Sequence, residues 1–246
     1  MNQKLKVLVE RIPGLNQDTI EKTIFTYKTQ IELDPLLDLQ EKILQRHTLL
    51  NVSDSKSDNN PELMIRKGKL LHRSNYDTET MDLILQTKEK VERMFPAELY
   101  QVFHRVCTSK EVLIKEDLNR LRAWFDTVGF QVIPKKAADI TTAISTMEQQ
   151  TELEILFRFN TFPFSVTDFK TYISPASSSY YRAVHYHIGI GKICVEIQFR
   201  TPAIDQWSRM HHATHYKPIV VTNQEEKNLV MEFGFIANWV DFKALA

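Results

Sequence analysis

Histidine, glutamate, tyrosine and arginine are concentrated in one short segment, YYRAVHYHIGIGKICVEIQFR, at residues 180–200. Imidazole and carboxylate groups can move protons or bind metal ions, and guanidinium groups bind phosphates, so this segment is the first candidate for a functional site. Both halves of the segment alternate apolar and polar residues, which predicts two β-strands, and GIGK between them is typical of a tight turn.

The alternation also predicts how the two strands face each other, because opposed residues in an antiparallel pair share a face. With Ile190-Gly191 at the turn, one face is apolar and contains Val184, Tyr186, Ile188, Ile193, Val195 and Ile197. The other face pairs Tyr181 with Arg200, Ala183 with Gln198, His185 with Glu196, and His187 with Cys194. This polar face is a candidate site, and the solvated face of an edge hairpin is the alternative interpretation.

The segment that follows, FRTPAIDQWSRMHHATHYK, predicts a helix that begins near Pro202. Helical spacing places Trp207, His211 and His215 on one side of it. His211 and His215 have the spacing of the two histidines in HExxH zinc sites, but His212 stands where the glutamate would be, so we do not expect zinc here.

Composition and charge exclude several classes of protein. The 246 residues contain 31 Lys and Arg against 31 Asp and Glu, so no chain-wide basic field exists to bind nucleic acid. Cys107 and Cys194 form no CxxC pair and are expected to be reduced thiols. Neither a leader peptide nor a membrane span is evident, so we expect a cytoplasmic protein without membrane contact.

Helices are expected through most of the first hundred residues. Pro13-Gly14 interrupts the first, and others are predicted from about Asp18 to Glu32, from Asp34-Pro35 onward, and from about Asp77 to Met94. The all-polar SDSKSDNN at residues 53–60 is typical of a linker. We therefore divide the chain into an N-terminal helical segment, residues 1–60, and a second domain, residues 61–246.

The second part of the chain mixes strands and helices. LYQVFHRVC and FQVI predict strands at 99–107 and 130–133, on either side of a helix that ends at Gly129. A helix is expected over 137–150, strands over 152–159 and 166–173, and a last helix over 223–242. The apolar face of that last helix consists of Leu229, Val230, Phe233, Ile236, Ala237 and Val240.

Three blocks in this order, YRAVH, VEIQFRT and AIDQWSRMHHATHYK, resemble the end of the RelA/SpoT synthetase domain, over residues 180–217. The resemblance implies an α+β, nucleotidyltransferase-like fold with a mixed, mostly antiparallel sheet flanked by helices, which agrees with the order of elements above. It also implies an activity: transfer of a pyrophosphoryl group from ATP to the 3′-hydroxyl of GDP or GTP, with Mg²⁺, which makes the alarmones (p)ppGpp.

The resemblance implies roles for the matching residues on the acceptor side. Tyr181 would stack on the acceptor guanine, and His185 would contact the acceptor's phosphates. Arg200 and His212 would complete the acceptor site. These roles suit phosphoryl transfer, which depends on positioning and on neutralisation of charge.

Glu196 is the residue that the resemblance places at the reaction itself. Together with Gln198, Glu196 would hold Mg²⁺ or activate the 3′-hydroxyl. A cross-strand pair of Glu196 with a histidine is the simpler alternative. Tyr100 falls where the family has a metal-binding Asp, so Glu98 would have to supply the second carboxylate.

The donor side departs further from the family. Arg105 aligns with one family arginine and Arg73 with another, with Asn75 in place of a Lys, and the two arginines would clasp the adenine of ATP. Ordinary surface arginines are the alternative interpretation. In the block that contains Tyr181, Tyr180 and Ala183 stand where the family usually has Gly and Ser. The sequence from 135 to 164 is also longer than is typical.

Two other functions stay open. One is pyrophosphorylation of a tRNA 3′ end, and the other is a catalytically inactive nucleotide- or protein-binding module that has lost the donor site. The N-terminal hundred residues show no HD hydrolase pattern, so we expect no alarmone degradation. A homo-oligomer also stays open.

Overall fold

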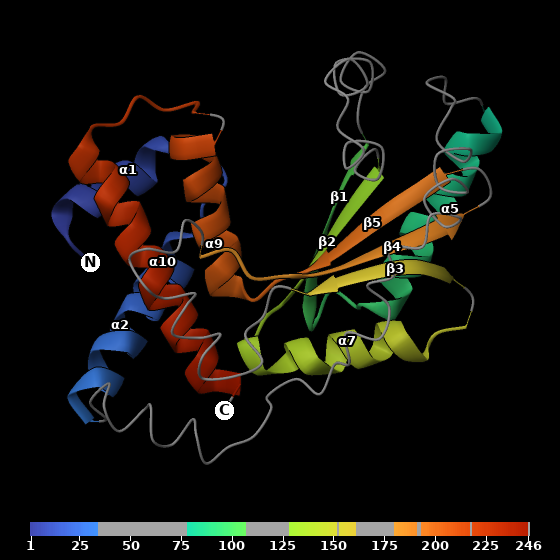
Figure 1. The fold of residues 1–246 in the computed structure, drawn as a ribbon, viewed down its shortest axis with the longest axis horizontal. Coiled ribbons are helices and arrows are strands. Elements are labelled where there is room, and N and C mark those ends of the chain that lie inside the picture. The colour runs from blue at the N-terminus through green and yellow to red at the C-terminus, as the bar shows by residue number, and fades with distance from the viewer. Residues whose placement is uncertain are drawn as a thin grey trace.

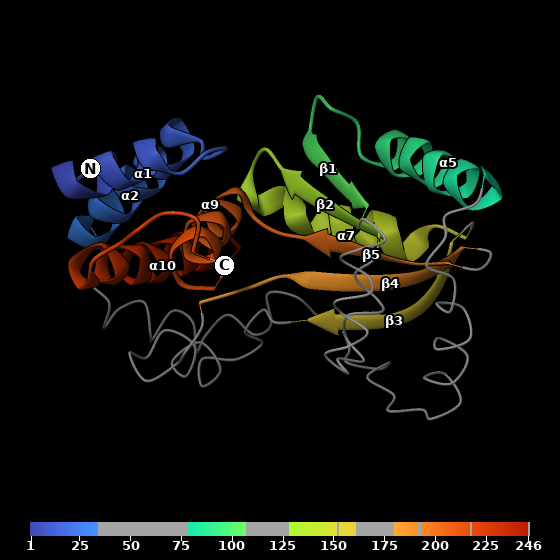
Figure 2. The same ribbon diagram turned by 90° about the horizontal axis from the view of Figure 1, so that it is seen from above.

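The computed structural model describes residues 1–33, 78–106, 128–151, 153–160, 180–190, 193–216 and 218–245 (Figure 1). Figures 1 and 2 show a sheet with helices α5 and α7 beside a group formed by helices α1, α2, α9 and α10. Strand β5 (Ile193–Phe199) leads almost directly into helix α9 (Pro202–His211) and so connects the two groups.

The N-terminal helices are α1 (Gln3–Arg11) and α2 (Gln17–Leu33). The side-chain oxygen of Asn2 accepts a hydrogen bond from the backbone N of Lys4 at 2.9 Å and so caps α1. Gly14 has a φ of 78°, a left-handed conformation that glycine adopts without steric cost. The predicted interruption at Pro13-Gly14 is therefore confirmed, whereas the helix predicted from Asp34 and the linker at 53–60 lie outside the described residues.

Five strands form one mixed sheet in the order β1-β2-β5-β4-β3. The other four strands are β1 (Tyr100–Val106), β2 (Val128–Pro134), β3 (Glu154–Asn160) and β4 (Val184–Ile190). The β2–β5 pair is parallel and the other three pairs are antiparallel. This arrangement confirms the predicted α+β fold with a mixed, mostly antiparallel sheet flanked by helices.

The first hydrophobic core lies between one face of the sheet and two helices, α5 (Thr78–Met94) and α7 (Ile140–Gln149). A single 3-10 turn, Ala137–Asp139, precedes α7. Val132, Tyr186 and Ile197 point into this core and are almost completely buried. Because side chains alternate along a strand, the neighbours of these residues point to the opposite face of the sheet.

The second core lies among α1, α2, α9 and α10 (Gln224–Leu245), and its buried residues include Leu8, Ile20, Trp207 and Phe233. The predicted apolar face of the last helix packs into this core and is confirmed. The predicted boundary at residue 60 lies outside the described residues and stays a prediction. No helix in the described part of the chain is long and apolar enough to cross a membrane.

Two predictions about the strands are wrong. Gly129 does not end a helix: it lies in β2, where it pairs with Arg105 on one side and Glu196 on the other, and this pairing outweighs the local helix-stop signal. The predicted hairpin register is also wrong by two residues, because Val184 pairs with Phe199 and Ile190 with Ile193. A two-residue shift keeps every side chain on its predicted face, and it gives the buried Val184 an equally buried aromatic partner.

The corrected register changes every predicted polar pair. His185 is opposite Gln198, and His187 is opposite Glu196 rather than Cys194. Tyr181 and Arg200 lie just outside the paired strands, beyond the start of β4 and the end of β5. The helices predicted at 77–94, 137–150 and 223–242 and the strands predicted at 99–107, 130–133 and 152–159 are confirmed, whereas residues 166–173 lie outside the described residues.

Candidate active site

The sheet face opposite the first core carries two rows of residues that cross the strands, and most of these residues are polar. The first row runs through Arg105, Gly129, Glu196 and His187. The second runs, in the same strand order, through Phe103, Gln131, Gln198 and His185. Opposed residues share a face, so the sheet presents both rows on one surface.

Five predicted site residues form a closed circuit of hydrogen bonds where β4 begins and β5 ends: Tyr181, His185, Glu196, Gln198 and Arg200. Glu196 Oε1 lies 2.7 Å from His185 Nδ1, and His185 Nε2 lies 2.9 Å from the Tyr181 hydroxyl. Arg200 donates to that hydroxyl at 3.1 Å and also to Gln198 Oε1. Gln198 Nε2 donates to Glu196 Oε2 at 2.5 Å and closes the circuit.

Glu196 is the anionic member of the circuit and is 7% exposed. Burial alone would raise its pKa, but the hydrogen bond from His185, the charges of His185 and His187, and the hydrogen bond from Gln198 together lower the pKa to about 2. His187 Nε2 lies 3.6 Å from the carboxylate oxygen that His185 contacts. Glu196 is therefore ionised at neutral pH, the state in which a carboxylate accepts hydrogen bonds and protons.

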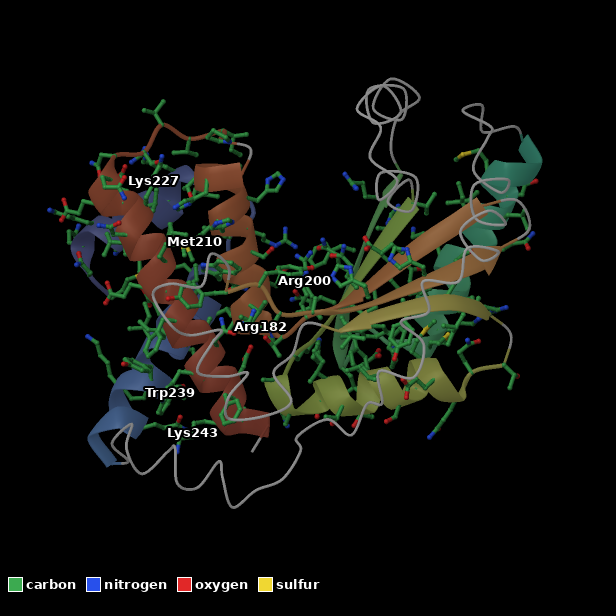
Figure 3. The ribbon with its side chains drawn as sticks, viewed as in Figure 1. Arg182, Arg200, Met210, Lys227, Trp239 and Lys243 are labelled. Atoms are coloured by element: carbon green, nitrogen blue, oxygen red, sulfur yellow. The ribbon has the colours of Figure 1, made fainter. Side chains whose placement is uncertain are left out.

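Arg200 connects the circuit to helix α9, and Figure 3 shows it between the sheet and that helix. Its guanidinium carbon lies 5.0 Å from the centre of the Tyr181 ring, and its Nη1 lies 3.7 Å from Asp205 Oδ1. Asp205 is 2% exposed and also accepts from Arg209 Nε at 2.7 Å. The guanidinium of Arg209 in turn lies 4.8 Å from the ring centre of Phe103, so charges of alternating sign extend from the circuit to β1.

The remaining predicted site residues lie outside the circuit. His212 is exposed and lies in the π-helical turn His212–Tyr216, which follows helix α9. Helix α9 has ten residues and begins next to Arg200, so its length places His212 about 15 Å from Arg200 along the helix axis. Arg105 is exposed and shares the row of Glu196, but β2 separates them, so their backbones are about 10 Å apart. Glu98 is exposed in the turn before β1, and Arg73 lies outside the described residues. The roles of these four residues stay predictions.

Tyr100, at the position of the family's metal-binding Asp, belongs to the first core. It is 6% exposed and packs edge-on against Phe95, with ring centres 5.4 Å apart. Within the described residues, no group of three or more His, Cys, Asp or Glu side chains could hold a metal ion. Both oxygens of Glu196 accept hydrogen bonds from side chains. Mg²⁺ usually takes one or two carboxylates together with the phosphates of a bound nucleotide, so Glu196 could contribute only part of such a site. A Mg²⁺ role for Glu196 and Glu98 stays a prediction.

Trp207 and His211 of α9 and His215 in the π-helical turn that follows it form a column of rings on one side, as predicted. Trp207 and His211 have ring centres 4.9 Å apart, and His211 and His215 are stacked at 4.7 Å with planes 10° apart. Burial, followed by the charges of His215 and His212, lowers the pKa of His211 to about 4. The column is therefore uncharged at His211 near neutral pH.

Sequence reasoning missed three residues of this surface: Phe103, Asp205 and Arg209. The alternation of QVFHRV could have identified Phe103, because it lies two residues from Arg105 and on the same strand face. The spacing of Asp205 and Arg209, four residues apart on a predicted helix, is that of a helical ion pair.

Comparison with known proteins agrees with this fold. Residues 98–219 match the sequence model described as "Region found in RelA / SpoT proteins". The GTP pyrophosphokinase YwaC of Bacillus subtilis (strain 168) is 26% identical over 175 residues, covering 66% of this chain and 72% of that protein. The crystal structure of small alarmone synthetase 2 from Bacillus subtilis is similar in fold, with a TM-score of 0.51 and 20% identity over 66% of this chain and 91% of that one. Through residues 98–219, the chain is a member of the RelA/SpoT family.

Proposed function

We propose that this chain is a pyrophosphotransferase that moves the β,γ-pyrophosphoryl group of ATP to the 3′-hydroxyl of GDP or GTP. The observation that carries the proposal is the closed circuit of Tyr181, His185, Glu196, Gln198 and Arg200 at the end of the β4–β5 hairpin. Family membership supports it, as does the similarity to a protein named as a GTP pyrophosphokinase.

The reaction needs a positioned hydroxyl, a base and cations. The 3′-oxygen of the acceptor attacks the β-phosphorus of ATP, the bond from that phosphorus to the bridging oxygen of the α-phosphate breaks, and AMP leaves. Arg200 within the circuit and Arg105 on the same sheet face carry positive charge that can neutralise phosphate oxygens. Mg²⁺ enters this proposal with ATP, as part of the Mg-ATP substrate.

The residues divide between acceptor and donor in this proposal. Tyr181, His185, Arg200 and His212 bind the acceptor nucleotide. Glu196, with Gln198 beside it, activates the acceptor's hydroxyl. Arg105, on the same sheet face and separated from Glu196 by β2, binds the donor together with Arg73. Because ATP and guanosine nucleotides are cytoplasmic metabolites, the activity belongs in the cytoplasm.

The test is a transfer assay with the purified chain, Mg²⁺ and γ-labelled ATP, with GDP, GTP or bulk tRNA as acceptor. We expect label on a guanosine nucleotide. Glu196→Gln, which keeps the shape and removes the charge, should abolish transfer in a chain that circular dichroism shows to be folded at the assay temperature. Glu89→Gln, the same change at an exposed site on α5, is the matched control and should transfer as the wild type does. Label that stays on ATP with every acceptor, beside a working synthetase, would refute the proposal.

A nucleotide-binding module without transfer activity is the second candidate, and the buried Tyr100 favours it, because no carboxylate stands at that position. Calorimetry with Mg-ATP separates the two, since loss of the donor site predicts no detectable ATP binding. Label on tRNA in the transfer assay would instead indicate that the acceptor is an RNA 3′ end.

A further inference from the structure

Phe103 is an aromatic side chain on the polar face of the sheet. It belongs to the second row of that face, in line with Gln131 of β2 and Gln198 of β5, and is 42% exposed. Single apolar side chains on a protein surface are common and need no function. Two further observations distinguish Phe103: a charged side chain holds its ring, and the ring lies at a defined distance from the circuit.

The ring of Phe103 is held from helix α9. The guanidinium carbon of Arg209 lies 4.8 Å from the ring centre, which is within the range of a cation–π contact. Arg209 is fixed in turn, because its Nε donates to the buried carboxylate of Asp205 at 2.7 Å. A ring that is positioned in advance loses little conformational entropy when a flat group binds to it. Phe103 is therefore suited to bind a planar ligand.

Strand β2 lies between Phe103 and the circuit, and its polar face is accessible to solvent. It contributes Gly129 and Gln131 to the two rows, and both are half-buried, whereas the residues that alternate with them are buried. Gly129 has no side chain that could block a ligand between Arg105 and Glu196. Neighbouring strands are about 4.8 Å apart, so about 10 Å separate β1 from β5 across this face.

This distance agrees with the arrangement of groups in ATP. In the proposed transfer the β-phosphorus lies next to the circuit, where Glu196 activates the attacking hydroxyl. The ribose and the α-phosphate separate that phosphorus from the base, and a span of about 10 Å accommodates both groups. Arg105, two residues from Phe103 on the same face of β1, carries positive charge for the phosphates. One ATP molecule can therefore place its base at Phe103 and its reacting phosphorus at the circuit.

We propose that the adenine of the donor nucleotide stacks on Phe103, with Arg209 as a positioning residue that holds the ring. This inference rests on the proposed function, in which ATP is the donor. Every base has a π-face that can stack on an aromatic side chain, and a nearby guanidinium adds a cation–π contribution. The competing explanation is a purely structural one, in which Phe103 and Arg209 only join β1 to α9.

The experiment compares Mg-ATP with Mg-tripolyphosphate, which carries three linked phosphates and no base. Calorimetry without an acceptor measures the Kd of each ligand for the wild type and for Phe103→Leu, which keeps an apolar side chain and removes the aromatic face. If adenine stacks on Phe103, the substitution should raise the Kd of Mg-ATP by about 5- to 100-fold and leave the Kd of Mg-tripolyphosphate unchanged. Phe25→Leu, at an aromatic residue that is 70% exposed on α2, is the matched control and should change neither value.

Three results would overturn the inference: an unchanged Kd of Mg-ATP in Phe103→Leu, an equal rise for both ligands, or a wild type that does not bind Mg-ATP. An equal rise would mean that Phe103 has only the structural role. These measurements need no turnover, so the transfer assay tests the proposed function separately. A chain that binds adenine at Phe103 and transfers nothing would remove the proposed function and leave the binding site in place.

Fluorescence provides a second test that does not depend on comparing two affinities. Phe103→Trp places an indole at the proposed site, and a base stacked on the indole quenches its emission. The difference in emission between this variant and the wild type should therefore fall when Mg-ATP is added, and it should not fall with Mg-tripolyphosphate. Phe25→Trp is the control and should respond to neither ligand. If saturating Mg-ATP leaves the emission of Phe103→Trp unchanged, no base stacks at this position and the inference is wrong.

Discussion

Glu196 lies directly opposite His187 in the β4–β5 ladder, yet its short hydrogen bond comes from His185, two residues along the same strand. The carboxylate oxygen is 2.7 Å from His185 Nδ1 and 3.6 Å from His187 Nε2. Diagonal neighbours in an antiparallel pair are within reach of long side chains, so the sheet allows this contact. His185 also contacts Tyr181 and so continues the circuit of hydrogen bonds. His187 lies near the carboxylate and contributes to its electrostatic environment.

This difference predicts unequal effects of the same substitution at the two histidines. His185→Gln interrupts the path from Tyr181 to Glu196 and should lower kcat for pyrophosphoryl transfer by about 100-fold. His187→Gln leaves that path intact and should lower kcat by less than about 10-fold. Steady-state kinetics of the two variants test the comparison, with thermal unfolding as the control for folding. Equal losses would mean that His185 has no special connection to the reaction.

Arg200→Lys tests whether the shape of the guanidinium matters as well as its charge. Arg200 donates to both Tyr181 and Gln198 and lies close to Asp205, which a single ammonium group cannot reproduce. We expect kcat to fall by about 10- to 100-fold, because each lost charge-assisted hydrogen bond corresponds to about 1.5–3 kcal/mol.

The control for this prediction is Arg209→Lys, the same change at the other arginine that contacts Asp205. Arg209 does not belong to the closed circuit, so its effect on kcat should be smaller. If kcat falls more for Arg209→Lys than for Arg200→Lys, the circuit is not the part of the surface that the reaction uses.

The polar face of the hairpin could be predicted from sequence because alternation alone assigns side chains to faces. The partners across the strands could not, since a register shift of two residues leaves the pattern unchanged. Only packing distinguishes the alternatives, through the buried pair of Val184 and Phe199. Gly129 is mispredicted for a related reason. A glycine after a helical pattern predicts the end of a helix, whereas its actual place in a strand depends on pairing with β1 and β5, which are distant in sequence.

The circuit itself was predictable as a set of residues and not as an arrangement. Three of its members lie on strands, and Tyr181 and Arg200 lie on the chain just beyond them. Their hydrogen bonds depend on how the chain leaves β5 and enters α9, where Thr201 caps the helix. That geometry depends on contacts with α10, far along the sequence, which no local pattern encodes.

Gly234 in α10 leaves room for two aromatic side chains. A Cβ atom at this position would lie 2.5 Å from Trp207 Nε1 and 2.6 Å from Tyr180 Cδ2, both in the second core. Gly234→Ala should therefore lower the free energy of unfolding by about 1–3 kcal/mol, although alanine favours helices by about 1 kcal/mol over glycine. Urea unfolding measures the change. Asn228→Ala, at an exposed position on the same helix, should change it by less than about 0.5 kcal/mol. Equal stability of Gly234→Ala and wild type would contradict the close packing.

Asp241 is a buried carboxyl group that should make the free energy of unfolding depend on pH. It is buried on α10 and accepts a hydrogen bond from Thr201. Burial raises its pKa from 3.8 to about 7, and the hydrogen bond from Thr201 opposes this only in part. The folded state therefore keeps the proton up to about pH 7, whereas the unfolded chain releases it near pH 3.8. The protonated carboxyl thus stabilises the folded state fully below pH 3.8, and this stabilisation declines as the pH rises to about 7.

The decline corresponds to about 4 kcal/mol for a pKa difference of about 3. Asp241→Asn has nearly the same shape and no charge, so its free energy of unfolding should rise relative to the wild type between pH 4 and pH 7 and then level off. Urea unfolding of both proteins across this range measures the difference, and Asp82→Asn on an exposed part of α5 is the control for general pH effects. A difference that does not change with pH would mean that Asp241 is ionised in the folded protein, which would require a buried cation beside it.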